Sequence, residues 1–140
     1  MENKMKLSNE QKQLLIDKAL EARERSYSPY SDFCVGAALL TADGEIILGT
    51  NVENASFGAT ICAERSAFCA AVSQGKRDFV AISILGAKKG ALPESLCSPC
   101  GMCRQFMVEF CSSDFVVLLY DGNNIVEKTL GELFPEVFKL

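Results

Sequence analysis

The sequence contains no histidine and no tryptophan among its 140 residues. Histidine is the usual general acid–base group of enzymes, so acid–base chemistry in this chain has to use another side chain, and glutamate is the natural replacement. No uninterrupted apolar run reaches the roughly 18 residues that a membrane-spanning helix needs. The first 13 residues are mostly polar and charged, unlike a signal peptide. We therefore expect a cytoplasmic protein with no membrane partner.

Basic charge is also scarce. The formal net charge is −4 at pH 7 and the isoelectric point is about 4.9. Nucleic-acid-binding proteins usually carry a basic surface, so this composition argues against a nucleic-acid partner. Hydrophobic residues make up 49% of the chain and charged residues 23%, which is typical of globular proteins. The length predicts a single domain over residues 1–140, which buries about 70% of its unfolded surface.

Cysteine, in contrast, is plentiful, with seven residues in the chain. In the cytoplasm thiols stay reduced, and an odd number of them does not suit a disulfide framework. Cysteine pairs in such proteins are more often metal ligands or catalytic groups than structural disulfides.

The predicted secondary structure alternates between helices and strands. Ser8 and Gln11 form a capping box in front of a helix over residues 9–25. The dipeptide Asp43-Gly44 predicts a hairpin, and Gly75 is the expected end of a helix. The other expected boundaries are hairpin strands over 33–40 and 45–52, helices over 62–75 and 100–111, strands over 79–86, 115–120 and 125–129, and a last helix that stops near Pro135.

Strands separated by helices favour an α/β fold. We expect three layers, α-β-α, in which helices cover both faces of a central mixed sheet of about five strands.

The motif "SPCGMCRQ" places Cys100 and Cys103 at the start of a predicted helix. Three residues apart on a helix, the two side chains share a face, and a helix N-terminus favours the thiolate form that a metal binds. Two other interpretations remain open from this motif alone. The pair fits a thiol redox site, or two small core residues, since free cysteine is commonly buried.

A second motif, "TICAERSAF", adds Cys62 and Glu64 at the start of another predicted helix. With Cys100 and Cys103, Cys62 gives three thiol ligands, and three protein ligands with one open position are typical of catalytic rather than structural zinc. In the first turn of a helix, Glu64 and Cys62 can both approach the same ion. Glu64 equally fits an acidic residue that complements the helix dipole.

Cys-Ala-Glu followed by Pro-Cys-x-x-Cys resembles the zinc-dependent nucleobase deaminases, with cysteine in the first ligand position. The segments "YSPYSDFCVGAALL", "NVENASFGATICAERSAF", "SPCGMCRQ" and "LFPEVF" are similar, in the same order, to the small homotetrameric cytidine deaminases of nucleoside salvage. This resemblance covers nearly the whole chain. It implies one Zn²⁺ per subunit and hydrolytic deamination of cytidine and 2′-deoxycytidine to uridine and 2′-deoxyuridine plus ammonia.

The resemblance also implies roles for individual residues. Zinc would be held by Cys62, Cys100 and Cys103, and protons would be carried by Glu64. The expected substrate contacts are Asn51 and Glu53 with the ribose hydroxyls, Phe33 against the nucleoside, the backbone of Ala63 and Ser98 at the base edge, and Phe138 stacked on the base in a neighbouring subunit. Phe57 stands where many relatives carry tyrosine, so a hydroxyl contact is absent there.

The implied reaction cycle uses these groups in turn. Zinc lowers the pKa of a water molecule, and Glu64 accepts its proton and passes it to N3 of cytosine. The hydroxide attacks C4, Glu64 delivers a second proton to the amino group, and ammonia leaves. Three thiolates around Zn²⁺ leave a net charge of −1, so we expect Arg65 to donate a hydrogen bond to a ligand atom and to offset this charge. Arg104 also follows a site residue, but fits an exposed helix arginine well.

Other functions remain open at this stage. A related deaminase for another aminopyrimidine, such as a nucleoside antibiotic, would use the same motifs. A non-enzymatic structural zinc module would need a fourth protein ligand, for which Cys97 is the thiol nearest in sequence. A thiol oxidoreductase would leave Cys62 and Glu64 unexplained. Without the resemblance, Asn51 and Glu53 fit a solvated strand end, Phe33 a core residue and Phe138 a packed chain end.

Overall fold

The computed structural model describes residues 6–140, so residues 1–5 of the expected domain lie outside the described residues. The helices are α1 (Asn9–Arg23), α2 (Ala63–Ser73), α3 (Gly101–Phe110) and α4 (Leu130–Leu133), with a short 3-10 helix η1 (Phe57–Ala59). The strands are β1 (Phe33–Thr41), β2 (Ile46–Thr50), β3 (Phe79–Lys88), β4 (Val116–Tyr120) and β5 (Ile125–Thr129). None of the helices in the described residues is both long and apolar enough to cross a lipid bilayer.

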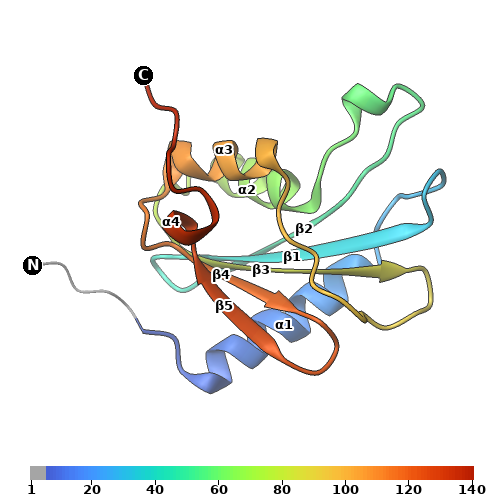
Figure 1. Cartoon of the computed structure of the whole chain (residues 1–140), viewed down its shortest axis with the longest axis horizontal. Coiled ribbons are helices and arrows are strands. Elements are labelled where there is room, and N and C mark those ends of the chain that lie inside the picture. Colours follow the sequence, from blue (N-terminus) through green and yellow to red (C-terminus); the bar gives the residue numbers. More distant parts are fainter. Residues whose placement is uncertain (1–5) are drawn as a thin grey trace, which may run out of the picture.

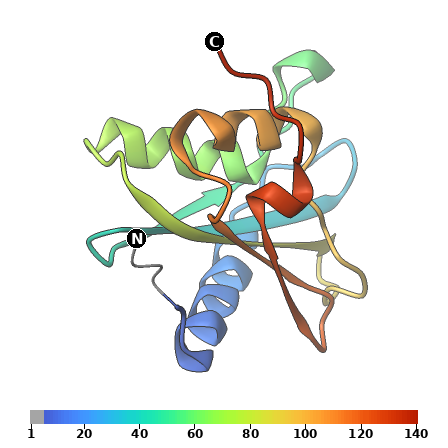
Figure 2. The same cartoon turned by 60° about the vertical axis from the view of Figure 1, so that its left-hand side comes forward.

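The strands form one mixed sheet in the order β2-β1-β3-β4-β5. Strands β3 and β4 run parallel, and the other neighbours are antiparallel. Helix α1 lies on one face of the sheet, and α2 and α3 lie side by side on the other (Figures 1 and 2). The predicted three-layer fold with five strands is therefore confirmed. The predicted ends differ by a few residues: α1 ends at Arg23 rather than 25, β2 at Thr50 rather than 52, and α4 at Leu133, before Pro135.

Local sequence signals account for several of these elements. Ser8 Oγ accepts a hydrogen bond from Gln11 N at 3.1 Å, and Ser8 N donates to Gln11 Oε1 at 2.9 Å, so the predicted capping box is present. Gly44, in the predicted hairpin turn, has a φ of 92°. Gly75 has a φ of 88° and follows the C-cap of α2. Both angles lie in the region that glycine adopts at little cost.

Two hydrophobic cores hold the layers together, one on each face of the sheet. The core under α1 contains Leu15, Ile16 and Ala19 of the helix. The core under α2 and α3 is built around Phe68, which is fully buried. The ring centroid of Phe68 lies 5.1–6.2 Å from those of four other phenylalanines, Phe79, Phe106, Phe110 and Phe115. Such aromatic contacts fix α2 and α3 relative to each other and to the sheet.

Gly49 allows the first turn of α2 to lie directly on the sheet. A Cβ atom added at Gly49 would lie 2.3 Å from the carbonyl oxygen of Ala63 and 2.5 Å from the amide nitrogen of Ala67. Both neighbours are helix backbone and cannot rotate away. A side chain at this position would therefore push the start of α2 off the sheet.

We predict that Gly49→Ala lowers the free energy of unfolding by about 1–3 kcal/mol, the usual cost of forcing an extra carbon into a packed interior. Chemical denaturation would measure this. Gly58→Ala is the matched control, because no atom lies within 4 Å of a Cβ added there. Equal stability of the two variants would contradict the close contact between β2 and α2.

Candidate active site

Cys62 and Cys100 occupy the same position at the start of two neighbouring helices. Cys62 is the N-cap of α2 and Cys100 is the N-cap of α3, and both have extended backbone angles. Serine, threonine and aspartate at an N-cap usually accept a hydrogen bond from their own helix. Neither thiol makes such a bond, so both sulfur atoms remain available to a ligand in front of the helix ends.

The three predicted ligands lie together. The sulfur atoms of Cys62, Cys100 and Cys103 all lie within 4.8 Å of one another. The distance is 3.9 Å between Cys62 and Cys100 and 3.5 Å between Cys100 and Cys103. Three sulfurs at about 2.3 Å from a tetrahedral zinc ion would lie about 3.8 Å apart, so the arrangement fits Zn²⁺. In the part of the chain that the structure describes, Cys97 does not belong to this group.

The thiols at this site have strongly perturbed acidities. The neighbouring Cys103 thiol, acting as a proton donor, lowers the pKa of Cys62 to about 5, and Arg65 contributes to the same effect. The contact with Cys62 and burial raise the pKa of Cys103. Cys97 behaves differently, because burial raises its pKa to about 11 and keeps it protonated at neutral pH. The lowered pKa favours the thiolate form of Cys62, which is the form that binds a metal.

Arg65 faces the cluster from the first turn of α2. Its Nη2 atom lies 3.5 Å from Cys62 Sγ and 3.5 Å from the carbonyl oxygen of Thr60. The contact with Cys62 raises the pKa of Arg65, so the guanidinium keeps its charge. Its Nε atom is buried and has no hydrogen-bond partner among the described residues. A buried donor without a partner is costly, and here it lies beside a group of sulfur atoms that become negative when they bind a metal.

Glu64 is a buried carboxylic acid beside the first ligand. Only 5% of its surface is exposed, because α2 lies against the sheet at this point. Loss of contact with water raises the pKa of Glu64 to about 7. A carboxyl group with a pKa near neutrality both accepts and releases protons readily, which is what general acid–base catalysis needs.

Asn51 is buried and its side chain is bonded to its own chain. The Oδ1 atom accepts hydrogen bonds from Val35 N at 2.9 Å and from the Ser26 hydroxyl at 2.5 Å, and Nδ2 donates to the carbonyl oxygen of Phe33 at 2.9 Å. An amide nitrogen has two hydrogens, so one donor of Asn51 remains. The alternative interpretation, in which Asn51 lies at a solvated strand end, is wrong. The side chain is buried and connects the end of β2 to the start of β1.

Glu53 is held by the loop that precedes β1. Its Oε1 atom accepts hydrogen bonds from Tyr30 N at 2.9 Å and from Ser31 N at 3.1 Å, and its Oε2 atom accepts one from the Ser31 hydroxyl. The Ser31 hydroxyl bond lowers the pKa of Glu53, so the carboxylate is charged. Sequence reasoning did not identify Ser31, because nothing in the local spacing shows that two segments 22 residues apart meet.

Three further predicted substrate contacts, Phe33, Ala63 and Ser98, come from a strand, a helix and a loop. Phe33 begins β1, is 37% exposed and rests against Gly86 of β3, where an added Cβ would lie 2.7 Å from its ring. Ala63 is the fully buried first residue of α2. Ser98 is exposed in the loop before α3 and accepts a hydrogen bond from Arg104 Nη2 at 2.9 Å.

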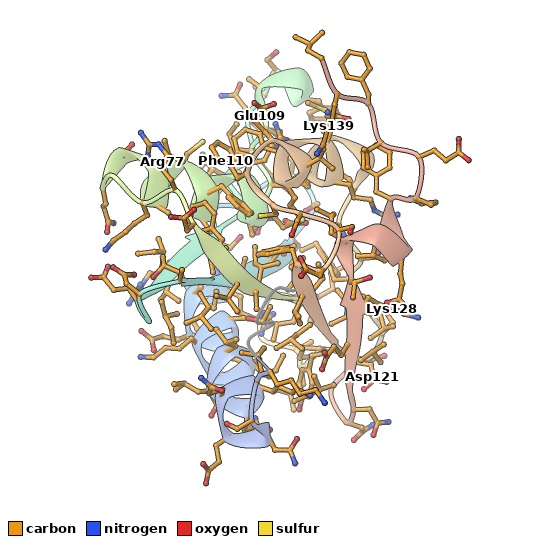
Figure 3. All side chains as sticks on the ribbon, turned by 90° about the vertical axis from the view of Figure 1, so that its left-hand side faces the viewer. Arg77, Glu109, Phe110, Asp121, Lys128 and Lys139 are labelled. Atoms are coloured by element: carbon orange, nitrogen blue, oxygen red, sulfur yellow. The ribbon has the colours of Figure 1, made fainter. Side chains whose placement is uncertain are left out.

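Phe138 is the predicted contact that stands apart from the others. Its side chain is 64% exposed, on a C-terminal segment that leaves the body of the molecule (Figure 1). Gln105 Nε2 donates a hydrogen bond to its carbonyl oxygen at 3.0 Å. Between this segment and α3 lies a cavity of about 300 Å³, lined by Gln105, Val108, Glu109 and residues 138–140. Figure 3 labels Glu109 on α3 and Lys139 on the segment beside it.

Comparison with known proteins gives an independent result. The family model of the cytidine and deoxycytidylate deaminase zinc-binding region matches residues 9–119. The cytidine deaminase of Halalkalibacterium halodurans is 50% identical over 130 residues, which cover 91% of this chain and 93% of that protein. The blasticidin-S deaminase of Bacillus cereus is 36% identical over 104 residues, which cover 72% of this chain and 74% of that protein.

A solved structure agrees with these matches. The crystal structure of cytidine deaminase from Burkholderia pseudomallei superimposes with a TM-score of 0.83 at 40% identity, and the alignment covers 94% of this chain and 100% of that one. The fold, the three converging thiols and the matched region lead to one conclusion. The chain belongs to the family of cytidine and deoxycytidylate deaminases that share this zinc-binding region.

Proposed function

We propose that the protein hydrolyses a cyclic amidine C–N bond, converting cytidine and 2′-deoxycytidine to uridine and 2′-deoxyuridine with release of ammonia. The observation that carries this proposal is the buried Glu64 carboxyl beside three thiols that are spaced for zinc. Relatives that are named cytidine deaminases, such as the one from Halalkalibacterium halodurans, support the choice of substrate.

Each group near the base has a role in this chemistry. When it is bound to Cys62, Cys100 and Cys103, zinc supplies a Lewis acid that favours ionisation of water. Glu64 takes a proton from the attacking water on its carboxyl oxygen and passes it to N3 of the base while C4 is attacked. Glu64 then takes the second proton of that water from the new C4 hydroxyl and delivers it to the amino nitrogen. The C4–N bond breaks, and the amino group leaves as ammonia. Arg65, 3.5 Å from Cys62 Sγ, offsets the negative charge that three thiolates bring to the site.

The sugar would be recognised by groups that are already fixed in place. Asn51 has one amide hydrogen left, so it acts as a donor to a ribose hydroxyl. Glu53 is held on Oε1 by two backbone N–H groups, which leaves a lone pair on Oε2 for a second hydroxyl. Phe33 packs against the nucleoside, and the backbone of Ala63 and Ser98 meets the base edge. Because these side chains are ordered by their own chain, binding costs little further ordering.

We also propose that residues 1–140 act as one catalytic domain in a cytoplasmic homotetramer of pyrimidine salvage. Several large apolar side chains on or next to segments that carry predicted site residues are exposed, among them Phe57 at 75% and Met102 at 65%. Exposed apolar side chains of this size favour contact with another subunit. The exposed Phe138 and the cavity beneath its segment support a role for this residue in an adjacent subunit's site.

A nucleoside antibiotic is the second candidate substrate. It is favoured by the match to a blasticidin-S deaminase, which covers less of the chain at lower identity than the match to a cytidine deaminase. A structural zinc module is not favoured, because the metal-ligand group in the described residues contains three thiols and no fourth protein ligand.

We predict that Glu64→Gln binds zinc normally but loses nearly all turnover of cytidine. The amide keeps the shape of the side chain but cannot carry protons, and such groups contribute about 10²–10⁴-fold to a rate. Loss of cytidine is followed by ultraviolet absorbance. Glu109→Gln, on the exposed surface of α3, is the control. A Glu64→Gln rate near that of the control would contradict the proton-carrier role.

Cys100→Ala should lose zinc and melt at a lower temperature than the wild-type protein, because a metal that joins two helix N-termini contributes to folding. The control is Cys69→Ala, which removes an exposed thiol of α2. Zinc content and thermal melting, each with and without a chelator, test this. Full zinc occupancy in Cys100→Ala would show that Cys100 is not a ligand.

Phe138→Ala should weaken binding of the nucleoside by about 10-fold to 100-fold while zinc stays bound, since stacking on a base contributes about 1–3 kcal/mol. Lys139→Ala is the control. To test whether the ring acts on a neighbour, Phe138→Ala and Glu64→Gln subunits are mixed, dissociated and reassembled. A shared site predicts that mixing restores part of the activity. Activity equal to the average of the two parents would exclude action across the interface.

A further inference from the structure

The three zinc ligands are supported by their own chain in very different ways. Cys103 is buried inside α3. Cys62 follows Ile61, whose amide and carbonyl groups both bond to Val52 at 2.9 Å, so the backbone that enters α2 is paired. Cys100 is exposed and comes at the end of a loop that contains no helix or strand. Its carbonyl oxygen accepts a hydrogen bond from Arg104 N at 2.9 Å, so α3 holds the residue on one side. On the other side its position depends on whatever holds that loop.

The loop has almost no hydrogen bonds of its own. Within the described residues, the segment from Leu92 to Pro99 takes part in two hydrogen bonds, and Arg104 donates both. Arg104 Nε donates to the carbonyl oxygen of Pro99 at 2.8 Å, and Nη2 donates to Ser98 Oγ at 2.9 Å. The peptide that contains the Pro99 carbonyl is also the one that enters Cys100. Arg104 thus fixes the backbone immediately in front of the exposed ligand.

The same guanidinium has a third partner outside the loop. Arg104 Nη1 donates at 2.5 Å to the carbonyl oxygen of Leu133, the last residue of α4. The C-terminal segment that follows α4 rises past α3 in Figure 2. All three nitrogens of one planar group are therefore used, each on a different acceptor. A planar fork with several fixed donors is a geometry that arginine supplies and lysine does not.

We propose that Arg104 is a positioning residue that holds the zinc ligand Cys100 in place and connects the loop 92–99 to the end of α4. The interpretation of Arg104 as an exposed helix arginine is therefore wrong. Its side chain is partly buried and forms three hydrogen bonds. The inference rests on the zinc site of the proposed function, but not on the identity of the substrate. It predicts that Arg104 slows the release of zinc, because a ligand on a fixed loop recombines with the ion before it escapes.

The test compares rates of zinc release from the full-length, zinc-loaded protein to an excess of a coloured chelator. Arg104→Gln removes the fork and the charge, whereas Arg104→Lys keeps the charge and loses the fork. Arg77→Gln is the matched control. Arg77 lies just beyond the end of α2 (Figure 3), and its Nη1 atom also donates to two backbone carbonyl oxygens, those of Val72 and Lys76. Melting of each zinc-free variant records its general loss of stability.

We expect Arg104→Gln to release zinc about 10-fold faster than the wild-type protein, the lower end of the effects seen when residues that orient metal ligands are replaced. Arg104→Lys should also release zinc several-fold faster, while Arg77→Gln should release it at the wild-type rate. If Arg104→Gln does not fold, the lysine variant still gives the comparison.

Three outcomes among the variants would overturn this inference alone. Zinc release from Arg104→Gln at the wild-type rate would show that Arg104 does not hold the zinc ligand in place. Wild-type release from Arg104→Lys would assign the effect to charge instead of the fork. Equal acceleration in Arg77→Gln would assign it to general destabilisation. A wild-type protein that holds no zinc would overturn the proposed function as well, so the two failures are distinguishable.

Discussion

The site depends on one geometric constraint, which is that two helices must begin at the same place. The N-caps of α2 and α3 bring Cys62 and Cys100 to a sulfur–sulfur distance of 3.9 Å, although 38 residues separate them in the chain. Neither helix could be shifted along its axis by one turn, about 5.4 Å, without separating the thiols. The contact of Gly49 with α2 and the phenylalanines around Phe68 fix both helices on one face of the sheet. The hydrophobic core therefore determines metal geometry as well as stability.

The absence of histidine shapes the rest of the chemistry. Three thiolates are more negative than three imidazoles. The chain places the guanidinium of Arg65 against Cys62, and the guanidinium of Arg104 bonds to the loop that precedes Cys100. It also places a carboxyl group where loss of water moves the pKa of Glu64 to about 7, close to that of an ordinary histidine. Burial thus gives a glutamate the acidity for which enzymes usually use an imidazole.

Sequence reasoning succeeded where the cause of structure is local. The capping box of Ser8 and Gln11 and the turn at Gly44 each depend on a few consecutive residues, and both are present. The three cysteines could be assigned to one metal because zinc chemistry restricts the number and type of ligands. Local reasoning failed where a side chain depends on distant backbone. Arg104 gave no local sign of its bond to Leu133, and Asn51 gave none of its bond to Phe33.

The two cysteines at helix N-caps also bear on how this site tolerates change. Serine, the usual conservative replacement for cysteine, is among the most favourable N-cap residues because its hydroxyl bonds to the helix behind it. At position 62 or 100 a serine would turn toward the free N–H groups of its own helix and away from the metal. The variant would have better-capped helices but would lose the metal, and with it both the activity and the stability that the metal contributes. At these two positions the local helix cap alone favours serine, whereas the metal, which contributes to folding and to catalysis together, favours cysteine.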